Sequence, residues 1–363
     1  METKHLPLVV DLDGTLVKSD TLLESFFILL KVSPISICFL PFWLFQGRAA
    51  FKRKIANIVD LNPQDLPYDN ELLAYLEGQK QQRKLILMTA ADKKIAKAVA
   101  SHTGIFDEYY GSCGDLNLKG DEKVKLLKEK YGDYAYAGNS KADISVWREA
   151  KEAIIVYRSV KLRDYLRRSH TKIGLELDRT VPFFKSFTKA IRVRQWVKNL
   201  LVFAPLVLAH KFQDLKAASA SIQACLAFSL CASSVYLLND LLDLAADRAH
   251  RSKRRRPFAA ADLSLGVGII AAPLFLLIGT AIGFQISYGF AIILTIYYLI
   301  TLAYSFKLKS IVLVDGIVLA TLYTLRIFAG SIATGIHLSK WLLIFALFFF
   351  YSLALAKRAT ELL

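Results

Sequence analysis

Cysteines and acidic residues are scarce in this sequence of 363 residues. The four cysteines stand far apart, at positions 38, 113, 225 and 231, which excludes a disulfide scaffold. Asp and Glu number 31 against 47 Lys and Arg, so the formal net charge is +16. The 54% share of hydrophobic residues excludes a disordered chain. A mean hydropathy of +0.37 beside this positive charge indicates membrane spans joined by basic cytoplasmic loops.

The sequence also lacks nucleic-acid-binding motifs and a cleavable signal peptide. It contains no zinc-ligand spacing, helix-turn-helix pattern or aromatic RNA-binding platform, and its basic residues gather at the ends of apolar runs. We therefore expect a membrane, and no nucleic acid, as partner. The opening residues METKHLPLVVDLDGT reach charged positions after a short apolar run, so the N-terminal part is expected to stay in the cytoplasm.

The composition changes near residue 185, which predicts two domains. Residues 1–160 mix charged and apolar positions in short blocks, as in a soluble domain. Residues 190–363 are dominated by long apolar runs, as in a membrane domain. The charged stretch between them, residues 161–189, is predicted to be a linker, either an interfacial amphipathic helix or an ordinary solvated one.

The second half contains about six candidate membrane spans, of which the first and last are short for a span. They cover residues 196–209, 217–238, 263–282, 284–304, 311–332 and 341–356. Basic residues follow the second, fourth and sixth of them, whereas the alternate loops carry few. This asymmetry predicts an integral protein of the cytoplasmic membrane, with the basic loops and the N-terminal domain in the cytoplasm.

Three short apolar runs in the first half each end in polar residues. Residues 6–10 lead into Asp11-Leu12-Asp13-Gly14-Thr15, residues 85–88 into Thr89, and residues 134–137 into Gly138-Asn139-Ser140-Lys141-Ala142-Asp143. We interpret these runs as buried parallel strands, whose C-terminal ends form the ligand-binding edge of an open α/β sheet. Lys123 precedes the third strand on a predicted helix.

This ordered set of motifs resembles the haloacid dehalogenase superfamily of phosphatases over residues 1–160. The resemblance implies an α/β fold with a Rossmann-like parallel sheet and a helical cap at about residues 20–80. It implies Asp11 as the nucleophile, Asp13 as the general acid and base, and Thr89 and Lys123 as phosphate contacts. It also implies a Mg²⁺ site at Asp11, Asp13, Asn139 and Asp143.

Asn139 departs from the resemblance, because that family usually has Asp at this position. An amide oxygen coordinates Mg²⁺ without a charge, so metal affinity is expected to fall. The domain is therefore predicted to be either an active phosphatase or a degenerate regulatory or scaffolding domain. Residues 25–58, which contain Pro34 and Pro41, are predicted to be either an interfacial segment or a buried helical cap.

The second candidate span ends in an acidic motif, Asn239-Asp240-x-x-Asp243-x-x-x-Asp247. On a helix, spacings of three and four residues place the three carboxylates on one face, where they repel each other. Two Mg²⁺ ions and a diphosphate would neutralise them, and the basic residues that follow, Lys253 and Arg254 among them, would add charge for phosphates. The alternative is a solvated acidic helix end.

Residues 190–363 resemble the UbiA superfamily of intramembrane prenyltransferases and, within it, the decaprenyl-phosphate phosphoribosyltransferases. The resemblance rests on the acidic motif and on the stretches RVRQWVKN (192–199), YSFKLK (304–309) and RIFAG (326–330). It implies an all-α helical bundle, here with about six of the usual nine spans, so we expect a truncated bundle. The implied phosphate contacts, besides Asn239, are Lys198, Lys253, Arg254, Tyr304, Lys309, Arg326 and Lys357.

Two further features bear on the chemistry. Arg326 lies in the middle of a predicted span, where it is expected to meet a substrate phosphate or an acid on another helix, because Asp315 is eleven residues away on the same helix. Most UbiA members carry a second acidic motif after the sixth span, but here the residues are Ala356-Lys357-Arg358-Ala359. Basic residues there favour an anionic phospho-sugar over a second metal-bound diphosphate.

The resemblances together imply a Mg²⁺-dependent membrane transferase. It would move 5-phosphoribose from 5-phosphoribosyl diphosphate to polyprenyl phosphate, and the N-terminal domain would remove the 5-phosphate. One alternative is prenyl transfer from polyprenyl diphosphate to an aromatic acceptor, in which Tyr297, Tyr298, Tyr304 and Tyr323 could stabilise an allylic cation. Another is a non-catalytic membrane scaffold whose soluble domain binds a phosphorylated ligand.

Overall fold

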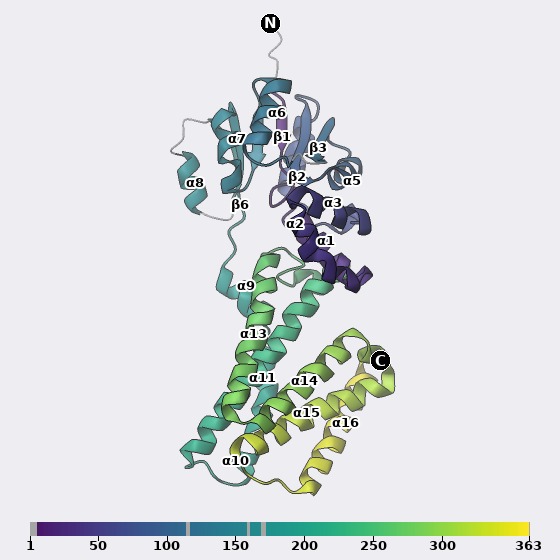
Figure 1. The fold of residues 1–363 in the computed structure, drawn as a ribbon, viewed down its shortest axis with the longest axis vertical. Coiled ribbons are helices and arrows are strands. Elements are labelled where there is room, and N and C mark those ends of the chain that lie inside the picture. Colours follow the sequence, from purple (N-terminus) through teal and green to yellow (C-terminus); the bar gives the residue numbers. More distant parts are fainter. Residues whose placement is uncertain (1–5, 114–116, 158–159, 168–171, 363) are drawn as a thin grey trace. The chain divides into compact units, whose positions relative to one another are not determined.

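The computed structural model describes residues 6–113, 117–157, 160–167 and 172–362 (Figure 1). It divides into two compact units. The first contains residues 1–186 together with 241–265, and the second contains residues 187–240 together with 266–363. Residues 241–265, which carry Asp243, Asp247 and the basic loop of the acidic motif, therefore belong to the unit that holds the N-terminal domain.

The first unit is built on a parallel six-stranded sheet with the strand order β3-β2-β1-β4-β5-β6. The strands are β1 (Leu8–Val10), β2 (Leu85–Asp92), β3 (Glu108–Ser112), β4 (Ala135–Gly138), β5 (Glu152–Tyr157) and β6 (Lys172–Asp178). The helices between them are α4 (Asn70–Gln79), α5 (Lys93–Thr103), α6 (Asp121–Tyr131), α7 (Ile144–Glu149) and α8 (Val160–Arg167). The three predicted strands and the predicted parallel sheet are confirmed, as is the helix that carries Lys123.

Both faces of the sheet are buried, which explains its uninterrupted apolar runs. Leu8 and Val10 of β1 pack into one core, and Val9 packs into the other with Tyr136 and Trp147. The strand order reverses at β1, which pairs with β2 on one side and with β4 on the other. Such a switch point opens a crevice at the C-terminal ends of its strands, and β1 and β4 end there in the predicted motifs.

Strand β6 lies where the sequence predicts a linker. Residues 172–178, KIGLELD, pair in parallel with β5 at the edge of the sheet. Ile173, Leu175 and Leu177 alternate with polar or small residues, which is the period of a half-exposed strand. The high charge of this stretch hides that alternation, so the linker prediction is wrong for these residues; residues 168–171 lie outside the described part.

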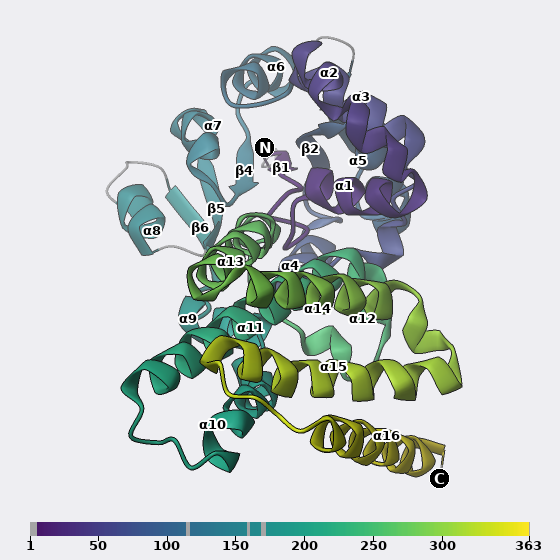
Figure 2. The ribbon, with the colours of Figure 1, turned by 60° about the horizontal axis from the view of Figure 1, so that its bottom comes forward.

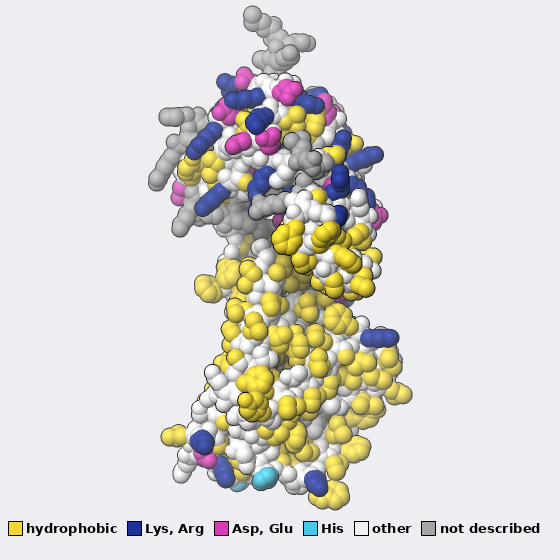
Figure 3. All heavy atoms as spheres, viewed as in Figure 1, with side chains coloured by type: hydrophobic (Ala, Val, Ile, Leu, Met, Phe, Trp, Pro, Cys, Tyr) yellow, Lys and Arg dark blue, Asp and Glu magenta, His cyan; other side chains and the backbone are white. Residues whose placement is uncertain are grey.

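The segment between β1 and β2 forms the helical cap. It comprises α1 (Thr21–Val32), the 3-10 helix η1 (Pro34–Phe39), α2 (Leu40–Phe45), α3 (Arg48–Ile58) and the 3-10 helix η2 (Pro63–Asp65). Leu29 of α1 and Ile55 of α3 share a buried cluster with Val59. By contrast, η1 and α2 expose large apolar side chains, up to 90% for Phe45, and this hydrophobic surface is visible in Figure 3. The cap is thus partly buried and partly exposed.

The second unit is helical, and five helices of the described chain are long and apolar enough to cross a membrane (Figures 1 and 2). They are α11 (Leu215–Leu242), α13 (Leu265–Ile286), α14 (Tyr288–Phe306), α15 (Val312–Thr334) and α16 (Lys340–Leu362). Five of the six predicted spans are thereby confirmed as helices of spanning length. Helix α15 packs against both α14 and α16.

The predicted span at residues 196–209 is wrong. After the short helix α9 (Phe183–Ala190), the chain forms the 3-10 helix η4 (Val193–Phe203) and the five-residue α10 (Ala204–Leu208). Pro205 lacks the N–H that a continuous helix would need, so it starts a new helix instead. The apolar residues pack against protein. Val202 is buried, and its backbone approaches Gly330 of α15 so closely that a Cβ on this glycine would lie 2.0 Å from the Val202 carbonyl oxygen.

Candidate functional site

Several residues of the predicted phosphatase motifs come together in the crevice beside β1. We call this group of residues the sheet site. Lys123 Nζ donates hydrogen bonds to Asp11 Oδ1 at 2.7 Å and to Tyr136 Oη at 3.0 Å. Tyr136 Oη in turn donates to Asp143 Oδ1 at 2.8 Å. Asp11, Lys123 and Asp143 are all buried. Tyr136 is not among the site residues predicted from the sequence, although a polar hydroxyl in the buried run YAYA could have indicated a partner there.

Burial perturbs the two carboxylates of the first motif. Together with the nearby Asp20 carboxylate, it raises the pKa of Asp13 to about 7, against the effect of a hydrogen bond from the Thr21 N–H. Burial also raises the pKa of Asp11, to about 6, although Lys123 acts in the opposite direction. A carboxyl that holds its proton near neutral pH suits a general acid, and an ionised one beside a lysine suits a nucleophile.

Asp143 accepts hydrogen bonds from residues of its own loop. Its Oδ2 accepts hydrogen bonds from the Asn139 N–H at 3.2 Å, the Ser140 N–H at 2.9 Å and the Ser140 hydroxyl at 2.8 Å. With Tyr136 on Oδ1, both oxygens already have donors. Asp143 therefore holds the loop in shape, and a bond from it to a metal would have to replace these contacts.

Asn139 lies directly over the first motif. A Cβ added to Gly14 would come within 1.9 Å of Asn139 Nδ2, and Gly14 has a φ of +77° that favours glycine. Within the described residues no three His, Cys, Asp or Glu side chains are placed to hold a metal ion. The oxygens left for Mg²⁺ in this crevice are those of Asp11, the Asp13 carbonyl and the Asn139 amide. Such a small donor set fits Mg²⁺ only with waters that complete its six positions.

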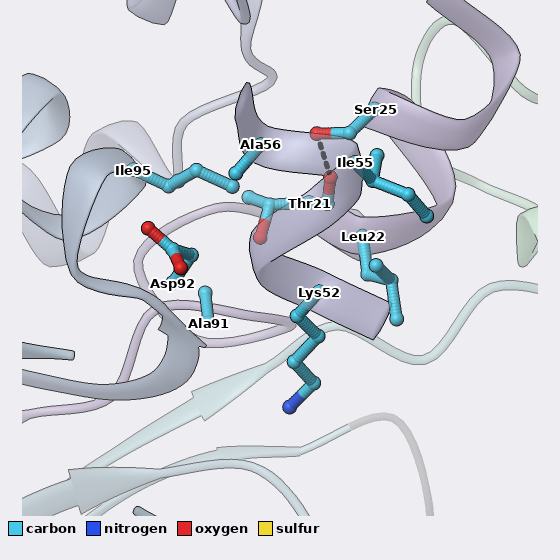
Figure 4. A pocket seen from close by; sticks show the side chains of 9 residues that line it. All are labelled: Thr21, Leu22, Ser25, Lys52, Ile55, Ala56, Ala91, Asp92 and Ile95. Carbon is cyan, nitrogen blue, oxygen red and sulfur yellow. Dashed lines mark hydrogen bonds between the residues drawn. The ribbon is translucent and has the colours of Figure 1, made fainter. Parts of the chain in front are cut away.

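Thr89 lies inside β2 and not at its end, because the strand continues to Asp92 through a register shift against β3. Its hydroxyl is fully buried and accepts a hydrogen bond from the Ala91 N–H at 2.9 Å. Ala91 lines a hollow of about 10 Å³ that α1, α3, the end of β2 and Ile95 of α5 enclose, as shown in Figure 4. That volume holds about one water molecule, so the cap packs closely against the sheet here.

The acidic motif does not lie on one continuous helix, contrary to prediction. Helix α11 ends at Leu242, Asp243 adopts non-helical angles (φ −102°, ψ 20°), and the short helix α12 (Leu244–Ala249) follows. Each carboxylate carries a basic partner: Asp240 accepts from Arg192 Nη2 at 2.5 Å, Asp243 from Lys31 Nζ at 2.8 Å, and Asp247 from Arg256 Nη1 at 2.7 Å. Arg192 also lies over the ring of Tyr236. These cations relieve the repulsion that the sequence pattern predicts.

Among the described residues Arg326 contacts neutral groups and not an acid on another helix, which was one of its two predicted partners beside a substrate phosphate. It is buried in α15, where Nε donates to Asn199 Oδ1 at 2.8 Å, Nη2 to Tyr297 Oη at 2.7 Å and Nη1 to its own helix at the Leu322 carbonyl. The guanidinium also lies 4.8 Å and 5.4 Å from the ring centroids of Tyr297 and Tyr323. Asn199 is held by Ser229, to which its Nδ2 donates at 2.9 Å.

A second buried charge lies at the start of α15. Asp315 is fully buried and accepts hydrogen bonds from Tyr304 Oη at 2.7 Å and Arg358 Nε at 2.6 Å. Asn239 donates from Nδ2 to Ser305 Oγ at 2.8 Å. The remaining predicted phosphate contacts lie on the surface; they are Lys198, Lys253, Arg254, Lys309 and Lys357.

Comparison with known proteins identifies the membrane part. The profile of the UbiA prenyltransferase family matches residues 200–360. The chain contains a UbiA prenyltransferase family domain. It is also 40% identical over 362 residues to the uncharacterized protein y4nM of Sinorhizobium fredii, an alignment that covers 99% of this chain and 70% of that protein. With this domain and five helices of spanning length, the protein is an integral membrane protein.

Two further relatives align with about half of this chain. The decaprenyl-phosphate phosphoribosyltransferase of Mycolicibacterium smegmatis is 38% identical over 180 residues, 48% of this chain and 56% of that enzyme. The nodulation protein NoeC of Azorhizobium caulinodans is 35% identical over 179 residues, 49% of this chain and 58% of that protein. The chain thus spans little more than half the length of these two relatives. A UbiA homolog from Archaeoglobus fulgidus, solved with DMAPP and Mg²⁺, is 20% identical, covers 46% of this chain and 61% of that chain, and has a TM-score of 0.40.

Proposed function

We propose that the protein transfers 5-phosphoribose from 5-phosphoribosyl diphosphate to a polyprenyl phosphate, with Mg²⁺ as cofactor. The observation that carries the proposal is the set of ion pairs on the acidic motif, in which Asp240 and Asp247 each hold an arginine. Arginine binds phosphate oxygens through two parallel hydrogen bonds, so Arg192 and Arg256 can exchange a carboxylate for a phosphate. The likeness to decaprenyl-phosphate phosphoribosyltransferases supports the choice of donor and acceptor.

In this reaction a phosphate oxygen of the polyprenyl phosphate attacks the anomeric carbon of the ribose. The bond from that carbon to the diphosphate breaks, and diphosphate leaves with the electron pair. Asp240, Asp243 and Asp247 would exchange the basic side chains that they bind in this structure for Mg²⁺, which prefers oxygen ligands, and Asn239 would assist them. Bound Mg²⁺ would stabilise the charge on the leaving diphosphate. Arg192 and Arg256 would bind phosphate oxygens.

The tyrosines of the membrane part support this donor over a prenyl diphosphate. Prenyl transfer would require free aromatic faces to stabilise an allylic cation. Tyr297 and Tyr323, two of the candidates, instead face the guanidinium of Arg326. Tyr304 donates its hydroxyl to Asp315. These side chains are engaged in holding buried charges, which leaves them unsuited to a carbocation.

We further propose that the sheet site removes the 5-phosphate from the lipid-linked product. Asp11 attacks phosphorus, the bond from phosphorus to the sugar oxygen breaks, and Asp13 gives its proton to that oxygen. Water then attacks the aspartyl phosphate, Asp13 takes the proton, and inorganic phosphate leaves. Lys123, 2.7 Å from Asp11, balances the charge. Asp11 and Asn139 are the side chains that would hold Mg²⁺, which would offset charge on the phosphoryl oxygens.

The transferase step is tested with the full chain in lipid nanodiscs. The protein is supplied with Mg²⁺, 5-phosphoribosyl diphosphate and polyprenyl phosphate, and diphosphate release is followed. Release should require both substrates and fall at least 100-fold in Asp243→Ala, a residue exposed enough to be truncated without loss of fold. The matched control is Glu149→Ala, an exposed acid that pairs with Lys128 away from the motif. Turnover with polyprenyl diphosphate and an aromatic acid instead would establish prenyl transfer.

The phosphatase step has its own readout in the same preparation. Mass spectrometry of the lipid product should show polyprenylphosphoryl ribose for the wild type. Asp11→Asn should accumulate the form that retains the 5-phosphate, at an unchanged rate of diphosphate release. A wild-type product that retains the phosphate would instead assign the sheet site a binding or scaffolding role.

A further inference from the structure

A cavity of about 250 Å³ opens beside Asp13 within the first unit. Its size is close to the lower end of small-molecule pockets, about 300–1,000 Å³. One side is polar and comes from the loops after β1 and after β4, with Asp13, Lys18 and Asn139 among its residues. The other side comes from residues 258–265, between α12 and α13, and includes Phe258 and Leu263. The cavity is therefore polar on the side of the sheet and largely apolar on the opposite side.

A buried ion pair joins the two sides of this cavity. Arg248 of α12 donates to both carboxylate oxygens of Glu24, at 2.5 Å and 3.1 Å, and both side chains are almost fully buried. Glu24 also accepts from the hydroxyl of Ser19, which lines the polar side, at 2.6 Å. Arg248 Nε donates to the carbonyl of Ala259, in the loop of the apolar side, at 3.0 Å. The chain Ser19–Glu24–Arg248–Ala259 thus fixes one wall against the other.

Backbone hydrogen bonds fix the conformation of the loop on the apolar side. Leu263 donates its N–H to the Pro257 carbonyl at 3.1 Å, and the Ala261 N–H donates to the Phe258 carbonyl at the same distance. Ala261, which lines the cavity, has a φ of 57°, a left-handed conformation that is strained for a non-glycine residue. Conformations of this kind persist where the surroundings hold them, and they gather at functional sites.

We propose that residues 257–265 form the substrate-recognition wall of the sheet site and select a phosphomonoester on a lipid-linked sugar. This inference rests on the phosphatase step proposed above and names its specificity. The polar side, with Asp13 and Lys18, receives the phosphate and sugar hydroxyls. The apolar side packs against the rest of a substrate that carries a polyprenyl chain. The loop leads along the chain into α13, a helix of spanning length.

The test compares two substrates on the full chain in nanodiscs. One is the lipid-linked 5-phosphoribosyl product that accumulates in Asp11→Asn, and the other is the soluble ester p-nitrophenyl phosphate. Ser264→Trp places a large side chain in the cavity from an exposed position, so folding should be retained. We expect the ratio of kcat/KM for the lipid-linked ester over the soluble one to fall at least tenfold. The matched control is Ser252→Trp, an exposed serine of the same segment that does not line the cavity, with an unchanged ratio.

Arg248 is tested as a positioning residue. Arg248→Ala should raise KM for the lipid-linked ester while kcat for the soluble ester changes little, and Arg248→Lys should restore part of the loss because it keeps one charge on Glu24. Wild-type hydrolysis of both esters with no change of the ratio in Ser264→Trp would overturn the proposed wall and leave the phosphatase step standing. Hydrolysis of neither ester by the wild type would overturn the phosphatase step itself, and the wall with it.

Discussion

Arg358 donates a hydrogen bond from Nε to Asp315 Oδ2 over 2.6 Å and thereby joins α16 to the start of α15. Asp315 is fully buried, whereas the Arg358 side chain is 39% exposed. This arginine stands where most UbiA members, by the resemblance drawn from the sequence, carry acids of a second metal-binding motif. The ion pair with Asp315 therefore gives Arg358 a structural role, in addition to any contact with a phosphate.

Removal of Arg358 should destabilise the second unit. Arg358→Ala takes the guanidinium away from the buried Asp315 carboxylate and leaves it the Tyr304 hydroxyl, which should lower the free energy of unfolding by about 1–3 kcal/mol. Thermal unfolding in detergent measures the change, with Lys357→Ala as the control on the exposed neighbour. The double variant Asp315→Asn with Arg358→Ala should recover part of the loss, because the amide needs no counter-charge. Equal melting temperatures for the two single variants would contradict this role.

The sequence predicts best what depends on neighbours in the chain. Asp11 and Asp13 follow a run of buried strand residues, and Lys123 lies on a regular helix, so short-range pattern is enough to locate them. Two of the three ion pairs of the acidic motif, those of Asp240 and Asp243, could not be found in that way. Arg192 lies 48 residues from Asp240, and Lys31 lies 212 residues from Asp243. Only the fold brings those charges together. Asp243, which pairs with Lys31, is also the residue at which the helix breaks.

Local pattern misleads where composition hides periodicity or a proline interrupts an apolar run. The residues of β6 are rich in charge, but their alternation fits an edge strand. Residues 196–209 are apolar, but Pro205 divides them into η4 and α10. Hydrophobicity reports burial and not whether lipid or protein surrounds a segment, which is why the first predicted span is wrong.

Asp69 should stabilise the first unit in a pH-dependent way. It caps α4 by accepting from the Leu72 N–H, and Arg179 donates to both of its oxygens at 2.6 Å and 2.7 Å. Burial alone would raise the pKa of Asp69, but the bonds from Arg179 and Leu72 outweigh it and lower that pKa. A lowered pKa gives stability that is complete above the unfolded value of 3.8 and lost as pH falls below it.

Asp69→Ala should therefore lower the free energy of unfolding at pH 7 by about 3 kcal/mol, because it leaves Arg179 without its buried partner and removes a helix cap. Urea unfolding at pH 7 and at pH 3 measures the difference, which should shrink at the lower pH. The control is Arg167→Ala, whose exposed pair with Glu176 should be worth at most about 1 kcal/mol. A loss that is the same at both pH values would contradict the ionic contribution.

Asp13 should show the opposite dependence, because burial raises its pKa to about 7. The folded state then binds the proton more tightly than the unfolded state, so this group costs stability as pH rises from about 4 to about 7. Asp13→Asn should raise the melting temperature by a few degrees at pH 8 and change it little at pH 4, while it abolishes release of phosphate. Circular dichroism at the two pH values measures the shift. A variant that melts below the wild type at pH 8 would show that the Thr21 contact outweighs burial.

The exposed part of the cap should contact lipid. Ile35, Phe39, Phe42 and Phe45 of η1 and α2 are all more than half exposed, and Lys54 lies over the rings of Phe42 and Trp43. Apolar side chains flanked by basic ones are typical of a segment that enters the surface of an anionic bilayer. Of the two predictions for the cap, the interfacial one therefore suits η1 and α2, while Leu29 and Ile55 form the buried part.

The native cysteines allow this prediction to be tested without new side chains in the segment. Cys38 of η1 and Cys113, after β3, are both exposed. A fluorophore on Cys38, in a Cys113→Ser background, should be quenched by brominated anionic lipids in nanodiscs. The same fluorophore on Cys113, in a Cys38→Ser background, should be quenched at least threefold less, because no comparable apolar surface surrounds that position among the described residues of β3. Loss of the Cys38 quenching in a Phe42→Ser, Phe45→Ser variant would assign it to those side chains, and equal quenching at the two cysteines would refute insertion of the segment.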